Sequence, residues 1–355
     1  MSFFVAVAGL AFLILIHEAG HFYTALAVGM RPRKFYVGFP PALVRVRRRG
    51  IEYGIGTIPL GGYVKIPGMH RPAARDLDFR LQHAMSQAPE LVKPLEAVKR
   101  PLERGNYDEA RAALDELEQA LREAGQPTDV LTDVRDALAP DAYWRQRTWK
   151  KVLVIFAGPG TNLLFAIIIF AVLFMSGGGK ATTTVDQVLS TRPAAHMGLR
   201  PGDKILAIDG KQVAAPSDIT RTISGSHGHA VTLLVLRGGR TLTLGPTRPR
   251  RSNGVYQLGF RLRGKSLSPP AALQESIRVT ALVSRDIVSS LGHLVHKQGR
   301  EDISSPVGIV QGSSEAVDQG AESYLWVLGL ISLSLALLNL LPLLPLDGGH
   351  IFFSL

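Results

Sequence analysis

Residues 17 to 21 read His-Glu-Ala-Gly-His, and on a helix this spacing places both imidazoles on one face. Two histidines so arranged can hold Zn²⁺, while the carboxylate of Glu18 beside them can accept and release protons. The motif lies in an apolar run, because residues 3 to 16 contain no charged or strongly polar side chain. A charged side chain at the centre of a bilayer costs about 2.5 to 3.5 kcal/mol, so a glutamate at this depth requires a compensating partner. A metal ion is one.

A catalytic zinc site takes three protein ligands, and the chain offers a third candidate far from the first two. Asp347 is a lone carboxylate at the end of a leucine-rich segment in which Pro342 and Pro345 interrupt helical hydrogen bonding. If the segment is helical from Leu325, Asp347 lies roughly 33 Å along it, in the same half of the membrane as the histidines. The alternative for Asp347 is a simple interfacial end of a span. The predicted ligands of one zinc ion per chain are His17, His21 and Asp347.

The composition is typical of a membrane protein that also has water-soluble parts. Hydrophobic residues make up 46% of the 355 residues and charged residues 19%. The net charge of +11 could indicate nucleic-acid binding, but the basic residues cluster beside apolar segments and form no aromatic–basic recognition motif, so we expect no nucleic acid partner. The chain has no cysteine, which excludes disulfides and thiolate ligands.

Three apolar segments, residues 3–30, 152–176 and 325–346, predict transmembrane helices. Basic residues follow the first segment and precede the second, so the positive-inside rule places residues 31–151 in the cytoplasm. The N-terminus and the stretch between the second and third segments are then extracytoplasmic. The metal motif faces the cytoplasmic side of the lipid bilayer.

Two soluble regions are expected between the spans. Residues 180–263 contain strand-like runs at 182–189, 204–208, 230–236 and 241–244 and a short helix at 216–223, which predict a compact β-rich domain. On the cytoplasmic side, an apolar stripe within residues 107–121 predicts a helix, in a hairpin that would serve as a spacer or docking element.

The stretch 275–303 predicts an amphipathic surface helix. It contains His293 and His296, which we interpret as solvated residues because no carboxylate shares their face.

The ordered set of motifs resembles the site-2 proteases, intramembrane zinc metalloproteases of the sigma-factor-regulating type. The similar segments are His17–His21, Gly61–Lys65, Phe156–Asn162, Ser305–Ile309 and Leu346–Gly348, and residues 195–211 resemble a PDZ domain. Two features depart from the family: Pro342 and Pro345 are separated by two leucines instead of one residue, and relatives continue beyond Leu355 into a fourth span.

The resemblance implies a polytopic α-helical membrane protein of the bacterial cytoplasmic (inner) membrane, with an inserted extracytoplasmic β-rich PDZ domain, three visible spans and a truncated fourth. It implies cleavage of single-span membrane proteins such as anti-sigma factors, with a substrate segment or peptide at the PDZ domain. The alternatives are a non-proteolytic zinc-binding scaffold that holds clients, and a PDZ domain that is only a rigid plug. The expected transmembrane helices lie in residues 1–30, which carry the zinc motif, in 152–176, and in 324–355, which carry the Leu-Asp-Gly motif. The expected segments between them are a β-hairpin region at 31–70, a helical insert at 71–151, the PDZ domain at 180–263 and an amphipathic surface segment at 264–323.

Further residues are candidates for contact with the substrate. Asn162 and Asn339 are polar at membrane depth and could either stabilise an oxyanion or join helices by hydrogen bonds. Strand-like residues 51–58 and 63–66, with a turn at 59–62, predict a β-hairpin beside the metal helix. Its edge either pairs with an unwound substrate or only seals the mouth of the site. The residues expected at this edge are Gly62, Tyr63 and Val64.

Overall fold

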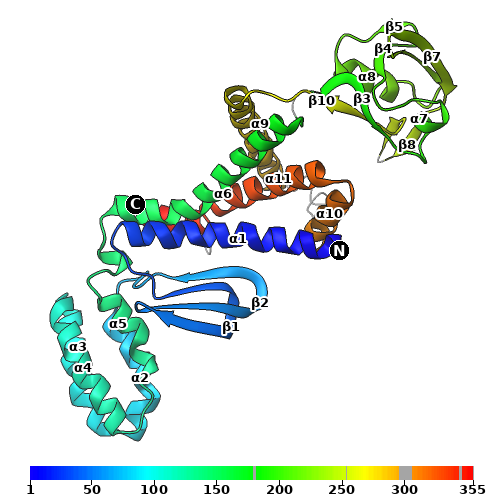
Figure 1. Cartoon of the computed structure of the whole chain (residues 1–355). Coiled ribbons are helices and arrows are strands. Elements are labelled where there is room, and N and C mark those ends of the chain that lie inside the picture. Colours follow the sequence, from blue (N-terminus) through cyan, green and yellow to red (C-terminus); the bar gives the residue numbers. More distant parts are fainter. Residues whose placement is uncertain (179–180, 253, 296–305, 344–345, 355) are drawn as a thin grey trace. The chain divides into compact units, whose positions relative to one another are not determined.

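The computed structural model describes residues 1–178, 181–252, 254–295, 306–343 and 346–354 (Figure 1). The chain forms two compact units. One comprises Met1–Phe165, Ile287–Asp318 and Leu330–Leu355, and the other comprises Ala166–Asp286 and Gln319–Gly329. All the predicted site residues belong to the first unit.

Within the described residues, three helices are long and apolar enough to cross a membrane: α1 (Ser2–Ala27), α6 (Thr148–Ser176) and α11 (Ala321–Asn339). The sequence predicts a third span that continues to residue 346, and this is wrong in its last third, because α11 ends at Asn339 and α12 (Asp347–Ser354) begins a new helix. In a continuous helix the ring of Pro342 would collide with the carbonyl of residue 338. The break places Asp347 at a helix start, so the distance expected along one straight helix does not apply. Pro345 lies outside the described residues.

The segment after α1 is a twisted sheet built from two long strands, β1 (Lys34–Arg48) and β2 (Ile51–Lys65), joined by a tight turn at Arg49 and Gly50 with φ of 51° and 81°. Each of the two strands pairs with the other along two separate stretches. Residues 34–37 lie opposite residues 52–55 and also opposite residues 62–65, while residues 42–48 lie opposite 51–56. Residues 52–55 run in the same direction as residues 34–37 and residues 62–65 run in the opposite direction, so the chain reverses between residues 56 and 62, as the predicted turn requires. The predicted hairpin is wrong only in its pairing, because residues 34–37 lie between its two arms.

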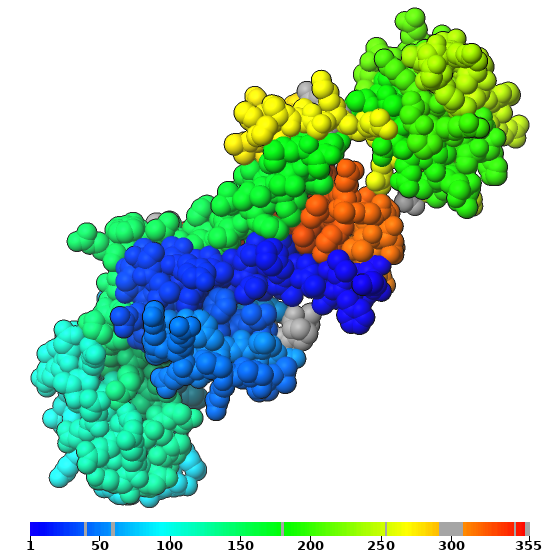
Figure 2. Space-filling view, in the orientation of Figure 1, coloured from blue at the N-terminus to red at the C-terminus, as the bar shows by residue number. Residues whose placement is uncertain are grey.

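The insert between β2 and α6 is a bundle of four helices rather than a hairpin: α2 (Ala74–Gln87), α3 (Val92–Glu103), α4 (Tyr107–Glu123) and α5 (Thr132–Leu138). Short 3₁₀ turns lie at Pro89–Leu91, Asp129–Leu131 and Tyr143–Arg145. The apolar stripe of α4 faces inward and joins leucines of the other helices in one core, and Figure 2 shows the closely packed outer surface of these helices. The buried residues of the stripe are Ala110, Leu114, Leu117 and Leu121.

The β-rich region in the second unit is a sheet with strand order β10-β3-β4-β6-β7, with β5 beside β4. Its strands are β3 (Ala181–Val188), β4 (Lys204–Ile208), β5 (Lys211–Gln212), β6 (Val231–Arg237), β7 (Arg240–Thr247) and β10 (Phe260–Gly264). Two short helices, α7 (Pro193–His196) and α8 (Pro216–Ser224), accompany it, and β8 (Arg250–Ser252) pairs with β9 (Val255–Gln257). The four strand-like runs of the sequence correspond to β3, β4, β6 and β7, whereas the β8–β9 pair is not predicted.

Two further helices precede α11: α9 (Pro269–Val295) and α10 (Pro306–Asp318). The predicted amphipathic helix corresponds to α9 up to residue 295, while residues 296–303, including His296, and the side chain of His293 lie outside the described part of the chain. Helix α10 lies against α1, and the hydroxyl of Ser2 hydrogen-bonds the carboxylate of Asp318. Ser313 and Ala316 are buried, so α10 is not a surface element on all sides.

Candidate metal centre

Three predicted ligands meet where α1 and α12 come together. His17 and His21 lie one turn apart on α1, and Asp347 is the first residue of α12. The Oδ2 atom of Asp347 is 3.1 Å from Nε2 of His17 and 3.3 Å from Nε2 of His21, and the two Nε2 atoms are 3.2 Å apart. Zinc–nitrogen and zinc–oxygen bonds of about 2.0 to 2.2 Å in a tetrahedral arrangement separate ligand atoms by roughly 3.3 Å. The spacing of the three atoms therefore suits one zinc ion.

The protonation of His21 is set by α6. Its Nδ1 atom lies 2.8 Å from the carbonyl oxygen of Val154. Because a carbonyl only accepts hydrogen bonds, Nδ1 must carry the proton, and a neutral ring then has its lone pair on Nε2.

The lone pair of His21 faces two other electron-rich atoms, Nε2 of His17 and Oδ2 of Asp347. Such atoms repel each other at these distances unless a cation lies among them. Apart from the Nε2 atoms of His17 and His21, no hydrogen-bond partner of Oδ2 of Asp347 is found among the described residues, although this oxygen is buried. Both observations fit a metal ion held by these three side chains.

Glycines let α6 approach the metal helix closely. A Cβ atom on Gly158 would lie 2.2 Å from Nε2 of His21 and 2.8 Å from Nε2 of His17, and one on Gly20 would lie 2.5 Å from the carbonyl oxygen of Ala157. Only glycine fits at either position without displacing backbone or imidazole. Gly158 is thus part of the site, although from the sequence it is only one residue of the motif Phe156–Asn162. The sequence signal for its role is a glycine next to Pro159 within an apolar helix.

Glu18 lies in the same cavity as the three ligands and faces β2. A Cβ atom on Gly62 would lie 2.2 Å from Cγ of Glu18, so β2 passes directly over this side chain. The cavity has a volume of about 770 Å³. All nine predicted site residues line it: Ile14, Gly61, Ile66, Met69, Ile155, Leu335 and His350 complete the wall around His17, Glu18, His21, Gly62, Tyr63, Val64, Asn162, Asn339 and Asp347.

The two asparagines differ in their surroundings. Asn162 on α6 is fully buried, and neither atom of its side-chain amide has a hydrogen-bond partner among the described residues. Its main-chain carbonyl accepts a hydrogen bond of 2.8 Å from the hydroxyl of Ser332 on α11. Asn339 ends α11 and is only partly buried. An unpaired buried amide costs about 1 to 3 kcal/mol, so Asn162 has the stronger need for a partner in the cavity.

Comparison with known proteins agrees with this geometry. The profile of peptidase family M50 matches residues 5–355. A protein of Agrobacterium fabrum provisionally named zinc metalloprotease Atu1380 is 29% identical over 97% of this chain and 83% of its own length. "Probable protease eep" of Enterococcus faecalis is 26% identical over 99% of this chain and 89% of its own length. "Metalloprotease MmpA" of Caulobacter vibrioides is 28% identical over 96% of this chain and 83% of its own length.

The match of the family profile extends over nearly the whole chain, including both segments that carry the candidate ligands. Two relatives of the chain have names that call them zinc metalloproteases, and the three apolar helices of the chain make it a multi-pass membrane protein. The chain therefore belongs to peptidase family M50, the site-2 protease family, and is a zinc metalloprotease.

Proposed function

We propose that the chain hydrolyses peptide bonds within or near the transmembrane segments of single-span membrane proteins, anti-sigma factors among them. His17, His21 and Asp347 hold the zinc ion, and Glu18 is the general base and acid. The observation that carries this proposal is the convergence of the three ligand atoms to mutual distances of 3.1 to 3.3 Å beside Glu18.

Each residue of the site has a chemical task in this proposal. Zinc, when bound, lowers the pKa of a coordinated water to about 7 and so makes a nucleophile available at neutral pH. Glu18 would accept a proton from the attacking water and deliver it to the leaving amide nitrogen, which leaves the carboxylate unchanged over the cycle. Asn162 donates a hydrogen bond from its unpaired amide to the carbonyl oxygen of the scissile bond, where negative charge develops.

The substrate must be extended before it is cut, because the peptide bonds of a helix are hydrogen-bonded and poorly accessible. In the register of the sheet, residues 62–65 have strand 34–37 on one side and no other strand among the described residues. This edge carries Gly62, Tyr63 and Val64, which line the cavity beside Glu18. An unwound substrate pairs with it through main-chain hydrogen bonds that replace those of its helix.

The proposed orientation in a bacterial inner membrane assigns each of the remaining domains to one side of the membrane. The basic residues on both sides of the insert keep residues 31–151 in the cytoplasm, and the β-rich domain of residues 180–263 is extracytoplasmic. This domain acts as a PDZ domain that receives a substrate segment or peptide and so selects which proteins reach the site. Asn339 contributes a second polar contact at the cytoplasmic end of α11.

The experiment that tests the proposal uses purified protein in liposomes with a single-span membrane protein that has a cytoplasmic domain, such as an anti-sigma factor. We expect cleavage within or next to the transmembrane segment, identified by mass spectrometry of the products, and loss of cleavage with a zinc chelator. Stable binding of substrate without cleavage, by a protein that retains zinc, would instead support a scaffold that only holds clients.

A further inference from the structure

The helical insert forms a second cavity next to the catalytic one. This cavity has a volume of about 350 Å³ and lies between the end of β2 and helices α2 and α5. It shares four wall residues with the catalytic cavity: Tyr63, Val64, Ile66 and Met69. The two cavities therefore adjoin the same stretch of backbone.

That stretch leads away from the reaction centre in a defined direction. Gly62 lies over Glu18, whereas Lys65, three residues later, donates to Asp133 of α5 at 2.7 Å and pairs with Asp136 at 3.1 Å. At about 3.3 Å per residue, roughly 13 Å separate Gly62 from Ile66. A peptide paired with the edge at Glu18 would reach the second cavity about four residues from its scissile bond.

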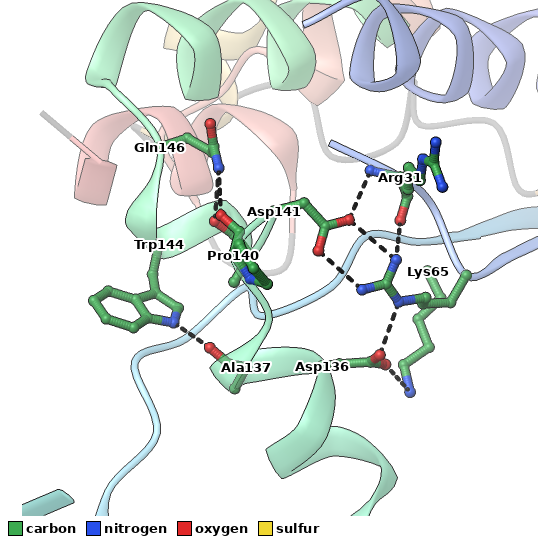
Figure 3. Close-up of polar contacts among 10 residues, drawn as sticks. Arg31, Lys65, Asp136, Ala137, Pro140, Asp141, Trp144 and Gln146 are labelled. Carbon is green, nitrogen blue, oxygen red and sulfur yellow. Dashed lines mark hydrogen bonds and ion pairs between the residues drawn. The ribbon is translucent and has the colours of Figure 1, made fainter. Parts of the chain in front are cut away.

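The insert is fixed to this strand and does not hang from it on a flexible linker. Arg33, just before β1, donates to Asp136 of α5 at 2.9 Å and to both carboxylate oxygens of Asp141 at 3.0 and 3.1 Å. Asp136 thus contacts both this guanidinium and Lys65, and Figure 3 shows Asp141 also held by the backbone N–H of Arg31.

The main chain after β2 is held as well. The N–H groups of Tyr143 and Trp144 donate to the carbonyls of Pro67 and Gly68 at 2.8 and 3.0 Å. The wall of the second cavity thus has a set position relative to the edge of β2.

We propose that the second cavity is a subsite for the polar flank of the substrate, the segment that follows the transmembrane part on the cytoplasmic side. The inference rests on the proposed cleavage of transmembrane substrates. The walls match such a segment, because Val64, Ile66 and Met69 form an apolar part and the rest carries charges of both signs. The charged wall residues are Lys65, Arg71, Asp76, Arg80, Asp133 and Asp136. The insert is therefore a specificity element of the protease.

Disulfide cross-linking tests the path of the substrate directly, because the chain has no cysteine of its own. The full chain carries Glu18→Gln to prevent turnover, together with His70→Cys in the second cavity or, as a matched control, Ser86→Cys on the exposed end of α2. The substrate carries single cysteines at successive positions of its cytoplasmic flank. We expect His70→Cys to cross-link most strongly about four to six residues from the scissile bond, and Ser86→Cys to give only background.

A second experiment measures selectivity in the active enzyme. We compare kcat/KM for a substrate with its cytoplasmic flank and for one truncated three residues from the scissile bond. Ala73→Trp fills the second cavity, and we expect it to reduce the ratio of the two values about tenfold, a change equivalent to about 1.4 kcal/mol. Ala112→Trp, on the exposed face of α4, should leave the ratio unchanged.

The outcomes separate the two proposals. If wild-type protein cleaves no transmembrane substrate, the proposed function fails. If it cleaves but His70→Cys cross-links no better than Ser86→Cys, or Ala73→Trp leaves the ratio unchanged, the subsite is wrong and the insert is only a structural spacer.

Discussion

At the level of single residues, the ligands depend on groups that carry no ligand chemistry. The carbonyl of Val154 orients His21, and the missing side chain of Gly158 leaves room for both imidazoles. The three candidate ligands could be proposed from the sequence, because the spacing of His17 and His21 is local and a carboxylate at membrane depth is rare. Val154 and Gly158 could not, since one acts through its main chain and the other through a close approach between helices.

Gly158→Ala should lower zinc affinity by about 10- to 100-fold, the range for loss of a supporting contact around a metal site. The added methyl would lie 2.2 Å from Nε2 of His21 and must displace the ring or α6. Zinc content is measured by metal analysis of the purified variant against a graded chelator. Gly160→Ala is the matched control, because its Cβ meets only the ring of Phe156, at 3.3 Å. Equal zinc retention by the two variants would contradict this role of Gly158.

Gly62→Ala should separate metal binding from catalysis. Its methyl would meet Cγ of Glu18 at 2.2 Å, so Glu18 is displaced while the three ligands are untouched. We expect normal zinc content and a loss of kcat of at least about 10²-fold, as for a misplaced general base. Gly312→Ala, which meets no atom within 4 Å, is the control. Wild-type turnover by Gly62→Ala would show that β2 does not constrain Glu18.

At the level of elements, regular patterns were predictable, whereas the pairing of distant segments was not. Strands β3, β4, β6 and β7 follow from short runs between turn residues, and the buried face of α4 follows from its period. The turn at residues 59–62 follows from Pro59 and Gly61–Gly62, but the pairing of its two arms does not, because residues 34–37 insert between them. The break before Asp347 has a signal in Pro342, but the resulting position of the carboxylate depends on tertiary packing.

The β-rich domain should lose stability in acid at a pH set by Asp203. Burial acts to raise the pKa of this carboxyl, but hydrogen bonds from Arg237 and from the N–H of Arg200 outweigh it and hold the pKa below its usual range. A depressed pKa adds stability above the unfolded value of about 4, and that stability is lost as the pH falls through the folded value.

Hydrogen exchange of peptides from β4 and β6, corrected for intrinsic rates, measures this effect in the full chain. We expect protection in wild type to be constant from pH 7 to 5 and to fall only below about pH 4. Arg237→Met should already lose protection at pH 7, by up to about 3 kcal/mol, because it leaves a buried carboxylate unpaired. Unchanged protection in this variant would contradict the assigned role of the pair.

At the level of the whole molecule, the chain combines apolar helices with two water-soluble lobes, the helical insert and the β-rich domain, that the proposed topology assigns to opposite sides of the membrane. The composition indicates this mixture, and the basic flanks assign the sides. The insert and the β-rich domain each have their own buried core. This allows each to fold in its own compartment.

Cysteine labelling tests the topology. Single variants Lys211→Cys in β5 and Ser86→Cys in α2 are exposed positions in an otherwise cysteine-free chain. We expect an impermeant thiol reagent added to intact cells to label Lys211→Cys alone, and to label both after permeabilisation. The reverse pattern in intact cells would invert the orientation.

The most direct test of the central claim is the zinc content of four purified variants, measured together with their cleavage of one transmembrane substrate. His17→Ala, His21→Ala and Asp347→Ala each remove one of the atoms that converge to 3.1 to 3.3 Å and should lose both zinc and activity. Glu18→Gln should keep one zinc per chain and lose cleavage by at least about 10²-fold. If Asp347→Ala binds zinc and cleaves like wild type, the metal site described here is wrong.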